Sequence, residues 1–398
     1  PASGVSIQQR SNDLNTLMSA NSLAYILDPE NKHIYINNLM KLVGFWESGT
    51  EKNLYDELYQ SSSGPWDNTI PPAGAFTSTV LAFDIVYPEL TEKQREEAEK
   101  IMSAVAGHYG RIMESHQVGV YGVRGLWAAY NGDIEDMKLQ MEGWLKYYDA
   151  YVTSSGAGTP GMAYALDRFT TATRLSKQIL PMLMRSVGND NEFYEKESNK
   201  MFAEWVLGYT YTPFMTQVWC FGDTNTYKYG QGMKTMINGM NFPYRAATVT
   251  KTAQQYANWL TDRLEVKPAG RLMNYIFLKE DMTDKKTPES RVFPDGGAWL
   301  YENYDNGNSL AGVLWNPEKE DGHGHKETNA ITIAAYGKLL MANGGYNGWA
   351  ASCKGYSWNY INSSALSANT VLINYEPGNV MHGYRYVEAA VPDACVGC

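Results

Sequence analysis

Apolar residues recur at steps of three and four over the first two-thirds of the chain, the spacing of amphipathic helices. One such stretch follows Asp28-Pro29, an N-cap residue with proline in the first helical position. A second opens with the capping-box pattern of Thr91 and Gln94, and a third begins at Asp133. Further helices are predicted at about 165–187, 194–209 and 251–264, with loops at 61–75, 153–161 and 222–232. No fixed-period repeat is visible, so the pattern favours an irregular barrel of antiparallel helix pairs over a regular solenoid.

The pattern changes after about residue 270. Short segments of β-branched and aromatic residues, bounded by Gly, Asn and Asp, predict antiparallel strands. They lie at 298–304, 310–315, 330–336 and 370–375. Helices followed by strands indicate the α+β class, and we expect a helical domain at 1–285 and a β-domain at 286–398.

Composition narrows the functional classes. The 398 residues are 44% hydrophobic and 19% charged, which excludes a largely disordered chain. The formal net charge of −10 argues against a nucleic-acid partner, since phosphate backbones require a basic surface. No apolar run approaches the roughly 20 residues of a membrane span. Four cysteines are too few for a disulfide scaffold, and the CxxC at 395–398 predicts a loose tail or an incidental disulfide.

Two histidines, in His323-Gly324-His325, precede the strand predicted at 330–336. Alternate residues of an extended segment point to the same side, so both imidazoles can face one ligand, metal or substrate. A solvated loop with two surface histidines is the alternative interpretation of the same spacing.

The surroundings of these histidines resemble the signature of heparinase II/III-like polysaccharide lyases, alginate-lyase-like members included. That signature has His-Gly-His, an acidic residue two positions on, a strand, a Gly turn, an apolar pair and Asp-x-Gly-Tyr. Here the acidic residue is Glu327, and the last motif begins with Asn343 in place of Asp. Similar motifs of that family occur at 221–225, 291–297 and 367–373, so the resemblance covers about 220–375.

The resemblance implies an incomplete (α/α) toroid followed by an antiparallel β-sandwich, in a secreted or periplasmic protein. It also implies β-elimination on an anionic, uronic-acid-containing polysaccharide, with alginate as the first expectation. In that reaction the uronate carboxylate must be neutralised before the C5 proton becomes removable, and a base and an acid complete the step. Only residues 371–398 follow Thr370, so we expect a partial sandwich or a piece of a longer protein.

The resemblance assigns catalytic roles to three residues. His116 is the expected carboxylate neutraliser or base, Tyr164 the base or acid, and His323 a neutraliser or base. The family places an Asn before the histidine, whereas this chain has Ser115, so Gln117 is a candidate substitute.

Other site residues follow from the same comparison. The family holds a structural zinc at positions that read His325, Asn343 and Ala368 here; Asn is a weak ligand and Ala has no donor atom. We therefore expect no cofactor for the chemistry, and a structural zinc or other divalent metal at His325 and Asn343 only if further groups complete the site. The candidate substrate-binding residues are Gln117, Arg124 and Arg291 for carboxylates, and Trp219 and Trp299 for sugar faces.

Two other functions are compatible with the sequence. One is a non-catalytic carbohydrate-binding protein on the same scaffold, suggested by Ser115 and by the altered metal ligands. The other is an (α/α)-barrel glycoside hydrolase with two carboxylates taken from Asp84, Asp223 and Asp295. No feature of the sequence indicates an oligomeric state.

Overall fold

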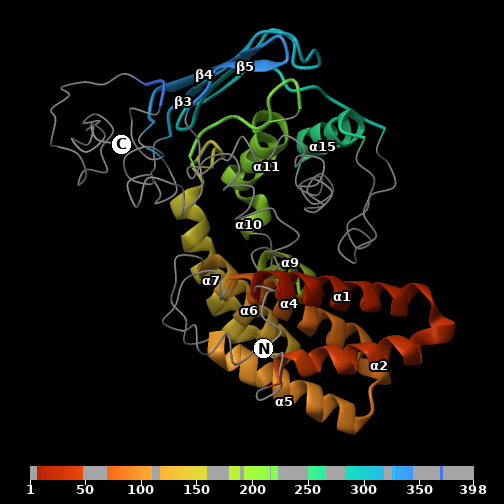
Figure 1. Ribbon diagram of the computed structural model, residues 1–398. Coiled ribbons are helices and arrows are strands. Elements are labelled where there is room, and N and C mark those ends of the chain that lie inside the picture. Colours follow the sequence, from red (N-terminus) through yellow and green to blue (C-terminus); the bar gives the residue numbers. More distant parts are fainter. Residues whose placement is uncertain are drawn as a thin grey trace, which may run out of the picture. The chain divides into compact units, whose positions relative to one another are not determined.

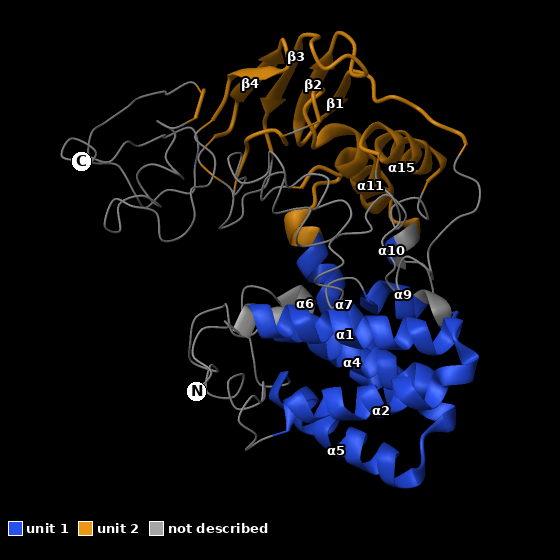
Figure 2. Ribbon diagram, turned by 45° about the vertical axis from the view of Figure 1, so that its right-hand side comes forward, with its two compact units in different colours: residues 1–148, 168–193, 268–278 blue, residues 149–167, 194–267, 279–398 orange. Residues whose placement is uncertain are grey.

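The chain forms two compact units in a computed structural model, and Figure 2 shows them in different colours. Unit 1 comprises residues 1–148, 168–193 and 268–278, and unit 2 comprises residues 149–167, 194–267 and 279–398. The structure describes residues 7–47, 70–109, 117–158, 179–188, 192–215, 217–222, 250–265, 283–317, 325, 327–343 and 368–370. The chain passes between the two units more than once.

Unit 1 is helical in its described residues (Figure 1). Its helices are α1 (Ile7–Leu27), α2 (Lys32–Val43), α4 (Ile70–Val86), α5 (Glu92–Tyr109), α6 (Gln117–Tyr130), α9 (Ile179–Ser186) and most of α7 (Ile134–Tyr151). Short 3-10 turns lie at Pro29–Asn31, Gly44–Trp46 and Tyr87–Glu89. Helix α1 contacts α2 and α4, α4 contacts α6, and α6 contacts α9. The large buried rings of this core include Trp46, Phe76 and Tyr109.

Two of the three predicted capping signals are confirmed. Gln94 Oε1 accepts from the Thr91 backbone N–H at 2.9 Å, and Thr91 Oγ1 accepts from the Gln94 N–H at 3.3 Å, which is the reciprocal capping box of α5. Asp133 accepts from the Asp136 N–H at 3.0 Å at the start of α7. Asp28 behaves differently, because a 3-10 turn precedes α2 and the Asp28 carboxylate accepts from the Tyr35 hydroxyl at 2.7 Å.

Helix α4 corrects the predicted loop at 61–75, because it begins at Ile70. Prolines 71 and 72 occupy its first turn, where a missing N–H costs little. The helix is buried on nearly all sides, so it has no polar stripe to reveal its period. Two of its hydroxyls donate within the helix: Thr77 Oγ1 to the Ala73 carbonyl and Thr79 Oγ1 to that of Ala75, both at 2.9 Å. The third, on Ser78, donates to the side-chain oxygen of Asn15 on α1.

Unit 2 contains a five-stranded antiparallel sheet in the order β1-β2-β3-β4-β5. The strands are β1 (Arg291–Phe293), β2 (Gly297–Tyr301), β3 (Ala311–Trp315), β4 (Ala330–Ala335) and β5 (Lys338–Met341), with an irregularity between Ile333 and Ala334. Three predicted strands are thus confirmed as β2, β3 and β4, whereas 371–375 lies outside the described residues. The described strands form one sheet, so a second sandwich layer stays a prediction.

The sheet shares its core with helices that precede the expected domain boundary at 285/286. Unit 2 also contains α10 (Glu192–Glu195) in part, α11 (Glu197–Tyr209) and α15 (Lys251–Arg263). Trp205 of α11 lies 6.2 Å from Trp299 and 6.4 Å from Trp315 between ring centroids. Because helix and sheet bury the same aromatic side chains, the sequence change from helices to strands is not a boundary between compact units.

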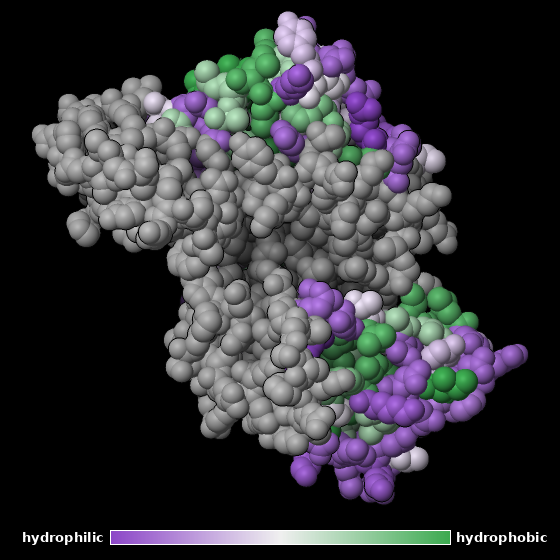
Figure 3. Space-filling model, in the orientation of Figure 1, coloured by the Kyte–Doolittle hydropathy of each residue, from purple (hydrophilic) through white to green (hydrophobic). Residues whose placement is uncertain are grey.

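The opposite face of the sheet carries exposed apolar side chains. Leu300 of β2, Leu314 of β3 and Ile331 of β4 point outward, and each follows a buried residue of its strand or is followed by one. Figure 3 shows hydrophobic residues among hydrophilic ones at the top of the picture, where Figure 1 places the strands. Among the described residues, no helix combines the length and apolarity that a membrane span requires.

Candidate functional site

The three predicted catalytic residues, His116, Tyr164 and His323, lie outside the described residues. Gln117 begins α6, but its side chain also lies outside the described part of the chain. The site is therefore built from the described segments that adjoin these positions in the chain. Those next to Tyr164 and His323 belong to unit 2.

The segment that follows His323 is held in place by the buried carboxylate of Glu327. Glu327 is 1% exposed, and one of its oxygens accepts from the backbone N–H of Gly222. The other accepts from the amide nitrogen of Asn343 at 3.0 Å. The Asn343 side-chain oxygen in turn accepts from the backbone N–H of Asn369 at 2.9 Å. The predicted site residues His325 and Asn343 are both buried, and Asn343 belongs to this cluster.

The hairpin 152–158, which precedes the segment with Tyr164, is also held by a carboxylate. Val152 and Gly158 pair antiparallel, and the Thr153 hydroxyl accepts from the Ala157 N–H at 3.0 Å. Asp295, in the turn between β1 and β2, accepts from the Ser155 backbone N–H at 3.1 Å. It also accepts from the hydroxyls of the two serines of the hairpin. The hairpin leads directly into the segment that carries Tyr164.

The charge of Asp295 is stabilised by these contacts. Burial raises the pKa of its carboxyl, but hydrogen bonds from Ser154, Thr153 and the Ser155 backbone outweigh this and hold the pKa below its ordinary value. The carboxylate is therefore occupied by the hairpin, which removes Asp295 from the carboxylate pairs considered for a hydrolase. Of the other two candidates, Asp84 lies on α4 in unit 1, and Asp223 lies outside the described residues.

Close backbone contacts fix the hairpin on both sides. Gly156 has φ +93°, and a Cβ there would lie 2.4 Å from the Met201 carbonyl carbon on α11. A Cβ on Gly296 would lie 2.3 Å from the Cβ of Ala157. Glycine is required at both positions for steric reasons. The sequence gives this anchor only a weak signal, namely the Gly-Ser-rich character of the predicted loop at 153–161.

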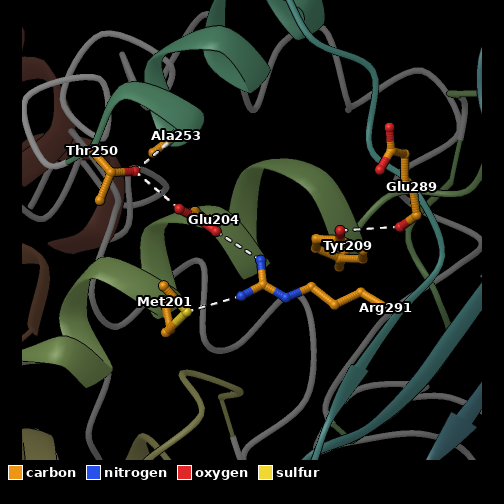
Figure 4. A network of polar contacts seen from close by, with 7 residues as sticks. All are labelled: Met201, Glu204, Tyr209, Thr250, Ala253, Glu289 and Arg291. Carbon is orange, nitrogen blue, oxygen red and sulfur yellow. Dashed lines mark hydrogen bonds and ion pairs between the residues drawn. The ribbon is translucent and has the colours of Figure 1, made fainter.

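Arg291 forms an ion pair within unit 2, and its predicted role as a substrate-binding cation stays a prediction. Figure 4 shows its guanidinium directed to Glu204 on α11, with Nη1 at 2.7 Å from the carboxylate. Its Nη2 lies 2.9 Å from the Met201 sulfur. Thr250, the N-cap of α15, donates from its hydroxyl to Glu204 at 3.2 Å and accepts from the Ala253 N–H at 2.9 Å. The network ties strand β1 to two helices of unit 2.

Trp219 and Trp299 are packing residues rather than sugar platforms, because both rings have 0% exposed surface. Trp299 lies on the buried face of β2, 5.1 Å from Phe293 between ring centroids. Arg124 lies half-buried on α6 of unit 1, without an ion pair to any described residue. Arg124 and Gln117 thus keep their substrate-binding roles as predictions.

The described residues do not supply a metal site. Within them, no group of three or more His, Cys, Asp or Glu side chains could hold an ion. At the positions that the resemblance assigns to zinc, Asn343 uses both ends of its amide in hydrogen bonds and Ala368 has no donor atom. The donor set therefore does not fit zinc.

Comparisons with known proteins show the class of fold. A crystal structure of heparinase III matches with a TM-score of 0.53 and 13% identity, over 89% of this chain and 53% of that chain. Heparan sulfate lyase HepC from Pedobacter heparinus, in a mutant form, matches with a TM-score of 0.53 and 11% identity, over 84% and 49% of the two chains. A further heparinase III gene product matches with a TM-score of 0.52 and 11% identity, over 85% and 51%.

The chain therefore has the α+β fold of heparinase III, with helices followed by an antiparallel sheet. It spans about half the length of these solved proteins. No family model and no curated protein matches the sequence.

Proposed function

We propose that the chain is, or belongs to, a polysaccharide lyase that cleaves a uronic-acid-containing glycan by β-elimination. The observation that carries the proposal is the heparinase III fold, combined with the ordered His-Gly-His motif at 321–346. The contacts of Glu327 with Gly222 and Asn343 add support, because they fix the segment that follows His323. The carbohydrate polymer is the expected partner, and a secreted or periplasmic location suits such a substrate.

The proposed chemistry needs three roles from this chain. One group neutralises the uronate carboxylate, so that the charge developing next to C5 is stabilised. A base removes the C5 proton, the released electron pair forms the C4–C5 double bond, and the C4–O4 bond breaks. The leaving oxygen takes a proton from an acid. We assign His116 to neutraliser or base, Tyr164 to base or acid, and His323 to neutraliser or base.

Two substrates lead the proposal. Alginate is the first, since the net charge of −10 and the scarcity of basic clusters disfavour a densely sulfated polymer. Heparan sulfate is the second, because the titles of similar solved structures name heparinase III and heparan sulfate lyase. The ion pair with Glu204 offsets the charge of Arg291, which weakens the attraction of this cation for sulfate or carboxylate groups.

The test is a screen of purified alginate, heparan sulfate, chondroitin and hyaluronan, with ultraviolet absorbance of the unsaturated uronate as the readout. We expect Tyr164→Phe to lower kcat by roughly 10²-fold or more, as for the loss of a general acid–base group. Tyr336→Phe is the matched control, since that hydroxyl is on an exposed side chain of the β4–β5 turn, and should leave activity unchanged.

The same screen distinguishes the lyase from the two alternative functions, a carbohydrate-binding protein and a glycoside hydrolase. Polymer binding without product from any substrate would reject the lyase and favour the carbohydrate-binding scaffold. New reducing ends without a double bond would favour the hydrolase.

A further inference from the structure

The cluster around Glu327 joins four stretches of chain that are distant in sequence. Its two carboxylate oxygens accept from Gly222 and Asn343, and Asn343 accepts from Asn369. All of the side chains that make these contacts are buried. We use the name "Glu327 cluster" for Gly222, Glu327, Asn343 and Asn369.

Backbone hydrogen bonds close the same region. The Glu327 N–H donates to the His325 carbonyl at 2.8 Å, and the Ile331 N–H donates to the Asn369 carbonyl at 3.0 Å. The Thr370 hydroxyl donates to the carbonyl of Thr328. These hydrogen bonds hold His325 and Glu327 at the start of strand β4.

The chemistry of Glu327 explains why this position is acidic. A backbone N–H and an amide NH₂, both hydrogen-bond donors, approach its two oxygens. An ionised carboxylate accepts at both oxygens, whereas a glutamine would present an NH₂ to one of the two donors. Burying the charge costs free energy unless such donors satisfy it, and charge-assisted hydrogen bonds are the stronger kind.

We propose that the Glu327 cluster takes the place of the structural metal implied by the sequence resemblance, so that this chain holds the His325 segment without a metal ion. Asn343 serves as a bridge between Glu327 and Asn369 rather than as a ligand. The proposal concerns only the folded protein, so it stands or fails independently of the lyase activity.

The first test measures metal content and thermal stability of the purified full chain. We expect far less than one equivalent of zinc, calcium or other divalent metal per chain, and the same Tm with and without excess EDTA. About one equivalent of bound metal, together with a fall in Tm on chelation, would overturn the proposal.

Two variants test the roles of the side chains. Glu327→Gln should lower the Tm, whereas Glu289→Gln, at an exposed position of the same unit, should not. Asn343→Asp places a second carboxylate against Glu327 and removes its donor, so we expect a lower Tm that added zinc or calcium does not restore. If a cation held this position, the new carboxylate would be a better ligand, and Asn343→Asp with added metal would match or exceed the wild-type Tm. If Glu327→Gln does not fold, the metal analysis of the wild type and Asn343→Asp still decide the question.

Discussion

The contact between the hairpin 152–158 and the β1–β2 turn can be tested by moving a methyl group from residue 157 to residue 296. In Gly296→Ala the new Cβ would lie 2.3 Å from the Cβ of Ala157 and 3.3 Å from that of Phe293. Carbon atoms in contact normally lie about 3.5–4.0 Å apart, so the hairpin must shift by more than an ångström. Ala157 has no exposed surface, which leaves no room for an easy displacement. Overpacking of this kind costs about 1–3 kcal/mol of stability.

The reverse change removes the obstacle. Ala157→Gly deletes the opposing methyl group and should cost about 1 kcal/mol, through lost burial and greater freedom of the unfolded chain. In the double variant Gly296→Ala/Ala157→Gly, the methyl on residue 296 occupies the space that residue 157 has vacated. We expect the double variant to be about as stable as Ala157→Gly alone, which gives a favourable coupling of about 1–3 kcal/mol.

The assay is denaturant unfolding of the wild type, both single variants and the double variant, followed by tryptophan fluorescence. Gly312→Ala in β3 is the control, because its new Cβ would only meet the Thr332 carbonyl oxygen at 3.7 Å, an ordinary contact. That variant should change the unfolding free energy by about 0.5 kcal/mol or less. Additive effects of the two hairpin–turn substitutions would show that residues 157 and 296 are not in contact, and would refute the anchor.

Three further predictions concern polar contacts. Asp295→Asn should remove a contribution to stability that depends on the ionised carboxylate. Because the folded-state pKa of Asp295 is lowered, this contribution is present above the ordinary Asp pKa of about 3.9 and is lost as pH falls through the lower folded-state value. Unfolding curves recorded from neutral to acid pH, for the wild type and the variant, would reveal it. Arg291→Met leaves the buried Glu204 without its ion pair and should cost about 3 kcal/mol by denaturation, with a smaller loss for Arg291→Lys; equal stability of Arg291→Met and wild type would contradict the network. Thr91→Ala breaks the capping box with Gln94 and should cost about 1 kcal/mol, measured as a lower Tm, while an unchanged Tm would argue against the cap.

The elements predicted from the sequence are those that depend on neighbours a few residues away. The capping box of α5 involves positions three apart, and strands β2 to β4 are recognisable from their β-branched and aromatic residues and from the turn residues that bound them. Helix α4 was missed for the opposite reason. Its environment is apolar on nearly every side, so its sequence of apolar, small and hydroxyl residues has no polar stripe. Its burial follows from contacts with α1, α2, α5 and α6.

The sequence by itself determined the α+β class, the order of the elements and the motif that resembles heparinase-type lyases. The tertiary structure decided what individual polar and aromatic side chains do. Arg291 binds Glu204 across 87 positions, Glu327 receives the Gly222 N–H across 105, and Asp295 holds a hairpin about 140 positions away. Trp219 and Trp299 are core residues for the same reason. A charged or aromatic residue looks the same in a sequence whether its side chain binds a ligand or packs against a buried partner. Only the long-range contacts of the folded chain distinguish these two roles.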